Sequence, residues 1–206
     1  MNFMNDPRAI EERSMAIIEE NLPELNKLPV EERQIVKRVI HTTGDFSYGG
    51  LVRISPCAVA AGLAAVRAGR PVITDVNMLK AGLNPGRLEA FGIRVNCYIR
   101  DPRVVAESRA QGITRAMAAM RLAAPEMDGG IVAVGNAPTA LFVLCELIRR
   151  GEASPALVVG TPVGFVGAVE SKEMLMDMPV PYITVLGTKG GSTVAAAVVN
   201  ALLYMA

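Results

Sequence analysis

The 206-residue sequence contains no tryptophan, only 4% aromatic residues and a single histidine, His41. Its apolar residues, 51% of the total, are therefore mostly aliphatic and are spread along the chain. No stretch reaches the roughly 18–20 uncharged apolar residues that a membrane-spanning helix requires. The first residues, MNFMNDPRAIEERS, lack the basic region and apolar run of a secretory signal. These absences predict a cytoplasmic protein without a membrane segment.

The sequence also lacks an excess of charge and a cysteine framework. Its 21 basic and 20 acidic residues give a formal charge of +1, which offers no bulk attraction to nucleic acid or to an anionic membrane. The three cysteines, Cys57, Cys97 and Cys145, are far apart and odd in number. We predict that they are small buried residues in a reducing compartment. One histidine and three scattered cysteines do not make a zinc site, so we expect no metal.

The common nucleotide and hydrolase motifs are missing. Residues 187–193 (GTKGGST) resemble a phosphate loop only superficially, because Lys189 precedes the glycine pair and no lysine adjoins Ser192. No GxGxxG follows the first predicted strand, and there is no GxSxG nucleophile elbow. A flavin or nucleotide protein is therefore a disfavoured alternative, and we expect no cofactor. A generic interaction domain is weaker still, since it leaves the polar turns after the predicted strands unexplained.

The pattern of apolar residues predicts helices first and then alternating strands and helices. The first 43 residues are predicted to be helical, with Asp6 as a cap before Pro7 and a second helix after Pro29. Ser55 and Pro56 are predicted to start another helix. Five short runs rich in β-branched residues are predicted strands: residues 71–75, 93–99, 131–135, 156–160 and 182–186. Predicted helices between and after them cover residues 102–120, with a break at Gly112, 137–150, 169–176 and 192–205.

Strands that form continuous apolar runs and alternate with helices are typical of a parallel sheet buried on both faces. The sequence therefore predicts one three-layer α/β/α domain over residues 1–206, of flavodoxin-like or Rossmann-like type. Ligands of such sheets bind beyond the carboxyl ends of the strands. Here those ends lead into residues 74–78, 135–141, 160–168 and 187–193. Three of these turns contain glycine and precede helices, so we expect their N–H groups to be available to a carboxylate or phosphate.

His41 lies off the apolar stripe of its predicted helix. At 100° per residue it shares the polar side with Gln34, Lys37 and Arg38, whereas the apolar side carries Ile35, Val36, Val39 and Ile40. Arg38, three residues earlier, can share one helix face with the imidazole. Histidine changes protonation near neutral pH and is a common general acid or base. Helical geometry leaves two readings open, a solvated surface residue and a catalytic one.

Ser14 shows the converse pattern, because it falls on the apolar stripe of the first helix, four residues after Ile10 and three before Ile17. Its hydroxyl either bonds back to the carbonyl one turn earlier or meets a ligand. Arg115, near the start of a predicted helix, has the position of an ordinary solvated arginine. For both residues the pattern alone leaves the role open.

Read together, five strings resemble the precorrin-8X methylmutase family. They are RSMAII (13–18), VKRVIHTTGD (36–45), GNAPTALF (135–142), PVGFVGAVESK (162–172) and GGS (190–192). The first is weak alone. The third and fourth, at the right spacing from a single histidine in RVIHTTGD, are highly specific. The resemblance runs from about residue 10 to about residue 200, in the order of the family.

The resemblance implies a flavodoxin-like fold, with N-terminal helices before a five-stranded parallel sheet, and a homodimer with its active site near the subunit interface. It implies an isomerase of cobalamin biosynthesis that moves a methyl group from C11 to C12 of precorrin-8X or cobalt-precorrin-8, giving hydrogenobyrinate or cobyrinate. It identifies His41 as the catalytic residue, and Ser14, Arg38, Arg115 and Asn136 as substrate-binding residues. HTTGD is closer to members that take the cobalt-loaded substrate. The alternative is a non-catalytic tetrapyrrole carrier that uses the same pocket.

Overall fold

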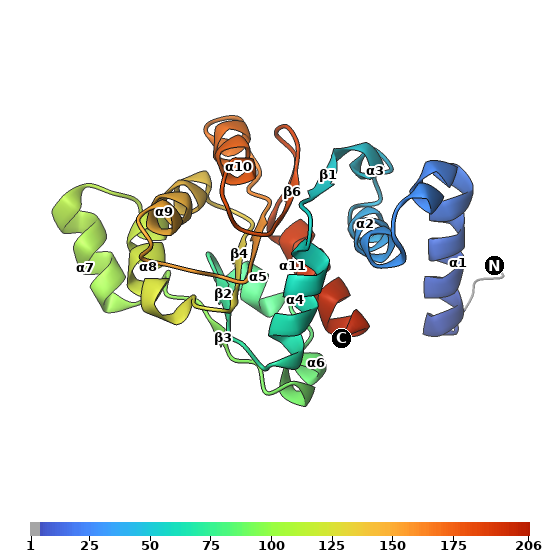
Figure 1. Ribbon diagram of the computed structural model, residues 1–206, viewed down its shortest axis with the longest axis horizontal. Coiled ribbons are helices and arrows are strands. Elements are labelled where there is room, and N and C mark those ends of the chain that lie inside the picture. Colours follow the sequence, from blue (N-terminus) through green and yellow to red (C-terminus); the bar gives the residue numbers. More distant parts are fainter. Residues whose placement is uncertain (1–4) are drawn as a thin grey trace.

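The computed structural model describes residues 5–206 (Figure 1). Residues 1–4, on which part of the expectation about the N-terminal segment rests, lie outside the described residues. The α-helices are α1 (Pro7–Asn21), α2 (Val30–Thr43), α3 (Tyr48–Leu51), α4 (Ala58–Arg67), α5 (Asn77–Ala81), α6 (Pro85–Ala90), α7 (Pro102–Gln111), α8 (Arg115–Ala123), α9 (Pro138–Arg149), α10 (Ala168–Met176) and α11 (Ser192–Met205). Two 3₁₀ helices are η1 (Pro23–Lys27) and η2 (Ala124–Glu126).

A single sheet of six strands forms the centre of the fold. The strands are β1 (Val52–Ile54), β2 (Val72–Thr74), β3 (Val95–Asn96), β4 (Ile131–Val134), β5 (Leu157–Gly160) and β6 (Tyr182–Val185), in the order β1-β6-β5-β4-β2-β3. Each of the five predicted runs contains one strand, and these five are parallel. Among themselves they run in the order 2-1-3-4-5, one of the common orders of doubly wound sheets.

The prediction of a purely parallel five-stranded sheet is wrong, because β1 adds a sixth strand antiparallel to β6. Ser55 prolongs this pairing: its N–H donates to the carbonyl of Tyr182 at 3.0 Å, and its hydroxyl accepts from the N–H of Tyr182 at 2.8 Å. Ser55 is therefore held by the sheet edge and does not start a helix. As a result α4 begins at Ala58, later than predicted.

Side chains alternate between the two faces of the sheet and form two apolar clusters. Ile131 and Ala133 of β4 belong to the cluster that also contains buried residues of α2, α4 and α11, whereas Val132 and Val134 belong to the cluster that contains those of α8 and α9. Figure 1 shows α8, α9 and α10 on one side of the strands and α4 and α11 on the other. The three predicted layers are present, and strand residues buried on both faces explain the continuous apolar runs.

On one side of the sheet the helices stack outward in order. α11 lies between the sheet and α2, and α1 packs on α2 as the outermost helix (Figure 1). α11 tolerates this central position because it is apolar nearly all round, with small residues such as Ala195, Ala196 and Ala197 buried along it. α2 meets α11 through the predicted stripe, since Ile35, Val36, Val39 and Ile40 are all buried.

Several local predictions are confirmed. The Asp6 carboxylate accepts the N–H of Arg8 at 3.0 Å, and Pro7 opens α1. Gly112 ends α7 with φ of +64°, a conformation that glycine adopts without strain, and this produces the predicted break before α8. Within residues 5–206, every helix is too short or too polar to cross a membrane.

Gly135, at the end of β4, lets α11 approach the sheet closely. A Cβ at this position would lie 2.6 Å from the Cα of Ser192, a backbone atom that cannot move aside. We expect Gly135→Ala to lower the free energy of unfolding by about 1–3 kcal/mol, as overpacking does, in urea titrations followed by circular dichroism. Gly50→Ala is the matched control, because a Cβ there has no neighbour within 4 Å. Equal stability of the two variants would contradict this account of the packing.

Candidate active site

His41 lies on the last turn of α2 and is exposed, so the prediction that it sits off the apolar stripe is confirmed. It lines a cavity of about 300 Å³ between α2 and α11. The other lining residues are Arg38, Thr42, Gly82, Thr193, Ala196, Ala197, Asn200 and Tyr204. The imidazole thus faces a concave space next to the start of α11, a position open to a ligand.

Lys37 corrects the predicted polar side of α2. Its side chain was expected beside His41, yet it is only 6% exposed because α1 covers it. The ammonium group lies 2.6 Å from the carboxylate of Glu19, which lowers the pKa of that carboxyl. Lys37 therefore joins α1 to α2 and is not available to a ligand at the His41 cavity.

Arg38 shares the His41 cavity, as the three-residue spacing predicts. Its guanidinium pairs with the carboxylate of Glu11 at 2.7 Å and lies 5.2 Å from the ring centroid of Tyr204. The ion pair and the aromatic face both restrict the side chain. A negatively charged ligand that reached Arg38 would compete with Glu11 for it.

Ser14 is not brought to this cavity within the chain. Its hydroxyl donates to the carbonyl of Ile10 at 2.9 Å, the back-bonding arrangement available to a serine inside a helix. It is half-buried on α1, between the exposed side chains of Ile10 and Ile17.

Asn136 and Arg115 lie further along the carboxyl edge of the sheet, and both are exposed. Asn136 follows Gly135, which abuts Ser192 at the start of α11, next to Thr193 of the His41 cavity. Arg115 is the first residue of α8. The hydroxyls of Thr114 and Thr139 lie 3.0 Å apart, so the starts of α8 and α9 are neighbours. Asn136 therefore adjoins the wall of the His41 cavity, and Arg115 lies beyond it, across the start of α9.

Asp75, which directly follows β2, is a buried carboxylate that pattern reasoning did not single out. It accepts the N–H groups of Gly135, Asn136 and Ala137 at 3.2, 2.8 and 2.9 Å. Burial raises its pKa, and the three N–H groups oppose that shift. The expectation that the 135–141 turn offers these N–H groups to a ligand is therefore wrong, because the protein's own carboxylate occupies them.

Lys172, the last residue of PVGFVGAVESK, is a second buried charge beneath the same edge. It is fully buried, and its ammonium donates to the carbonyls of Gly187 and, at 2.8 Å, Lys189. No carboxylate pairs with it within the described residues. Burial lowers its pKa to about 8. Lys172 thus fixes the 187–191 loop from the interior of the protein.

The same loop is tied to the segment after His41. The Lys189 ammonium contacts the Asp45 carboxylate and lies 2.7 Å from the Ser47 hydroxyl. The hydrogen bond from Lys189, followed by those from the hydroxyl and backbone N–H of Ser47, lowers the pKa of Asp45 to about 2. Loop 187–191 therefore bridges the end of α2 and the carboxyl ends of the strands.

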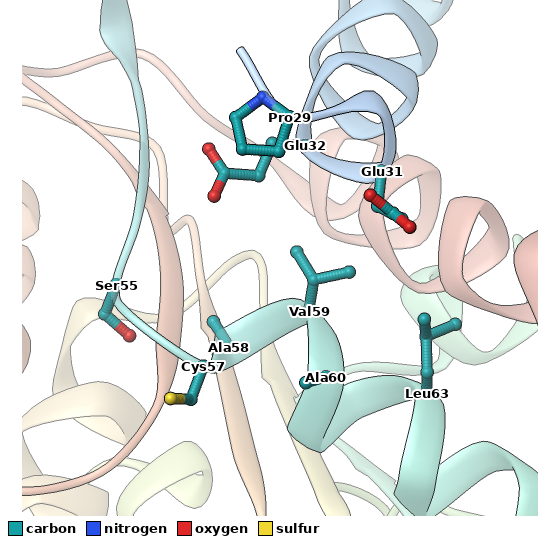
Figure 2. A pocket seen from close by; sticks show the side chains of 9 residues that line it. All are labelled: Pro29, Glu31, Glu32, Ser55, Cys57, Ala58, Val59, Ala60 and Leu63. Carbon is teal, nitrogen blue, oxygen red and sulfur yellow. The ribbon is translucent and has the colours of Figure 1, made fainter.

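A different cavity, of about 320 Å³, lies between the starts of α2 and α4 (Figure 2). Glu31 and Glu32 line it from α2, and Ser55, Cys57 and Val59 line it from the other side. None of the five predicted site residues lines it. Two carboxylates would repel an anionic ligand, so the His41 cavity suits a polycarboxylate better.

The cysteine prediction is partly wrong. All three are free, but only Cys145 is buried, and burial raises its pKa to about 12. Cys57 is exposed before α4, and Cys97 is half-buried. In the part of the chain that the structure describes, no three His, Cys, Asp or Glu side chains gather as metal ligands do.

Lys172 predicts a pH dependence of stability. Its pKa falls from 10.5 to about 8 on folding, so between those values the unfolded chain binds more protons than the folded one. The contribution of Lys172 to stability therefore rises with pH across this window. We expect Lys172→Met to remove that rise in urea titrations between pH 7.5 and about pH 10, and Lys80→Met, at an exposed lysine of α5, to retain it. If the rise in stability persisted in Lys172→Met, other titrating groups would be its cause.

Comparison with known proteins gives one family. The precorrin-8X methylmutase family model matches residues 9–205. A cobalt-precorrin-8 methylmutase of Priestia megaterium is 47% identical, over 97% of this chain and 88% of its own length. That of Salmonella typhimurium is 44% identical, over 99% and 98%. A precorrin-8X methylmutase of a Sinorhizobium species is 41% identical, over 98% and 96%.

A solved structure agrees in fold. The precorrin-8x methyl mutase from Thermus thermophilus superimposes with a TM-score of 0.87 at 47% identity, covering 96% of this chain and 95% of that one. The match spans both the N-terminal helices and the sheet. The chain belongs to the precorrin-8X methylmutase family and is an enzyme, an isomerase that moves a methyl group within one molecule.

Proposed function

We propose that this protein, acting as one domain over residues 1–206, moves a methyl group from C11 to C12 of precorrin-8X or cobalt-precorrin-8 in cobalamin biosynthesis. The product is hydrogenobyrinate or cobyrinate. The observation that carries the proposal is the position of the sequence's one imidazole: His41 shares a cavity with Arg38 near the carboxyl ends of the strands. The names of the relatives supply the substrate class. Three free thiols suit a cytoplasmic location.

In the proposed mechanism His41 acts as a general acid. A methyl shift in a conjugated macrocycle requires an electron-deficient receiving carbon, and protonation of a ring nitrogen creates one. The imidazolium of His41 donates that proton and recovers it after the shift, as a general acid and base does. The step is an isomerisation, so atoms and electrons balance without a redox partner.

Binding rests on the acetate and propionate side chains of the substrate. Arg38 and Arg115 carry the positive charge for them, and guanidinium groups bind carboxylates well. Asn136 offers an amide on the turn between these two. We propose that together they hold the ring so that the migrating methyl is aligned, since positioning contributes several kcal/mol in typical enzymes.

The visible spectrum tests the activity itself. Purified protein is incubated with precorrin-8X, with and without cobalt, and conversion is followed over time. We expect conversion, and the ratio of the two rates assigns the natural substrate. A protein that binds the ring tightly but leaves its spectrum unchanged in repeated turnovers would be a carrier.

His41→Ala is expected to retain tetrapyrrole binding but to lose rearrangement by about 10²–10⁴-fold, the usual contribution of a general acid. Binding is measured by titration with the product, and turnover by the visible spectrum. Retained product affinity serves as the control for folding. Near-normal turnover would remove His41 from the mechanism.

Arg38→Ala is expected to raise the dissociation constant of the product about tenfold or more, because a charge-assisted hydrogen bond is lost. The salt dependence of binding should become weaker at the same time. Glu11→Gln is the matched variant, since it frees the guanidinium from its ion pair and should tighten binding. Unchanged affinity in both variants would rule out a carboxylate contact at Arg38.

We also propose a homodimer in which Ser14 of one subunit serves the His41 site of the other. Support comes from α1, the outermost helix, where exposed Ile10 and Ile17 flank Ser14 on a face that α2 does not cover. Such a stripe is typical of a helix that packs on another protein surface.

Mixing inactive subunits tests the shared site. Ser14→Ala and His41→Ala are each expected to lose activity, and a mixed dimer holds one site with both residues intact. We expect partial recovery of activity after the two variants are unfolded and refolded together, with sedimentation as the measure of dimer formation. If both sites were complete within one chain, no recovery would follow.

A further inference from the structure

The loop between β5 and α10 carries two apolar side chains that are almost fully exposed. Phe165 is 94% exposed and Val166 89% exposed, and Val163 just before them is also exposed. Gly164 and Gly167, with φ of +146° and +75°, bracket the pair in conformations that favour glycine. The Gly164 N–H donates to the carbonyl of Thr188 at 3.1 Å. A loop fixed in this way presents its apolar tip, defined as Val163, Phe165 and Val166, to solvent.

One end of the loop adjoins the His41 cavity. Val163 lies against Gly191, since a Cβ at Gly191 would be 4.0 Å from a Val163 methyl and 3.9 Å from the Thr193 hydroxyl. Thr193 in turn lines the cavity with His41. Val163, the first residue of the apolar tip, therefore lies next to Gly191, which in turn lies next to Thr193 in the wall of the His41 cavity.

The other end of the loop adjoins the Asn136 turn. A Cβ at Gly167 would lie 3.5 Å from the Cβ of Pro138 and 3.3 Å from the ring of Phe142. Pro138 opens α9, two residues after Asn136. The loop thus spans the carboxyl edge of the sheet from the His41 cavity to the polar turn on its far side.

We propose that the apolar tip contacts one face of the bound macrocycle and positions the ring for proton transfer from His41. This rests on the proposed function. A ring with apolar faces and a carboxylate periphery is complementary to an apolar tip that has Arg38 toward one end and Asn136 and Arg115 toward the other. Burying the tip against the ring removes apolar surface from water and excludes water from the reacting centre.

The size of the tip favours the ring over a protein partner. Three side chains provide far less than the roughly 800 Å² per partner that a stable protein interface buries. The macrocycle, in contrast, is small enough for three side chains to cover part of one face.

Phe165→Ser and Phe165→Leu test the contact, with Val30→Ser as the control. Val30 is 58% exposed at the start of α2, eleven residues before His41, so it is an apolar surface residue remote from the cavity. Phe165→Ser is expected to raise the product dissociation constant and KM about tenfold or more, the factor that burial of such a side chain gives. Phe165→Leu should retain most of the affinity, and Val30→Ser all of it. Melting temperatures are expected to be unchanged, because the side chain is in solvent.

The outcomes separate this inference from the proposed function. Wild-type turnover with normal product affinity in Phe165→Ser would overturn the contact and leave the function standing. If Phe165→Ser weakened product binding while the wild-type protein showed no turnover, the contact would be supported and the protein would be a carrier. A change in sedimentation of Phe165→Ser, with unaltered product affinity, would assign the tip to a subunit interface and overturn the proposal. A wild-type protein that neither binds nor converts the ring would overturn both.

Discussion

The close packing of α11 between the sheet and α2 is the constraint on which the other features depend. Gly135 lets the start of α11 touch the end of β4. The small residues of α11 let α2 approach that helix from the opposite side. As a result, α2 ends near the carboxyl ends of the strands, and His41 lies on its exposed side. Asn200 of α11 adds a polar anchor, donating to the Gly82 carbonyl at 2.9 Å and accepting the Asn84 N–H at 2.8 Å, and Gly82 lines the His41 cavity. The cavity is therefore a product of core packing.

Most of the regular structure could be predicted because it follows from burial along the chain. Long amphipathic helices and strands buried on both faces leave clear periodic patterns, as in α2 and β4. The missed elements, α3, β1, α5 and α6, have three to six residues each, too few for a period to show. β1 also depends on its antiparallel partner, β6, far along the chain. Lys37 was misjudged for the same reason: its burial comes from α1, which no pattern within α2 reveals.

The candidate site residues were likewise predictable from pattern only where local spacing determines their position. That His41 and Arg38 share a face follows from helical spacing, whereas the roles of Ser14, Arg115 and Asn136 come from the family resemblance. Asp75 and Lys172 carry weak sequence signals, a carboxylate directly after a strand and a lysine at the end of a motif. Their partners lie sixty and fifteen or more residues away in the chain, so only the folded structure reveals what they hold.

Asp75 and Lys172 fix two glycine-containing turns at the carboxyl edge of the sheet. The buried carboxylate gathers three N–H groups of one turn, and the buried ammonium gathers two carbonyls of the next loop. Each charge is satisfied by the backbone dipoles it organises, which offsets its desolvation. Because Asp75 already accepts the N–H groups of residues 135–137, those groups are not free to bind a carboxylate, and in the proposed complex the positive charge comes from side chains at the rim. Arg38 and Arg115 are on that rim, and the apolar tip lies between them, so the proposed contacts to the polar and apolar parts of one ligand fall on separate, independently supported parts of the fold.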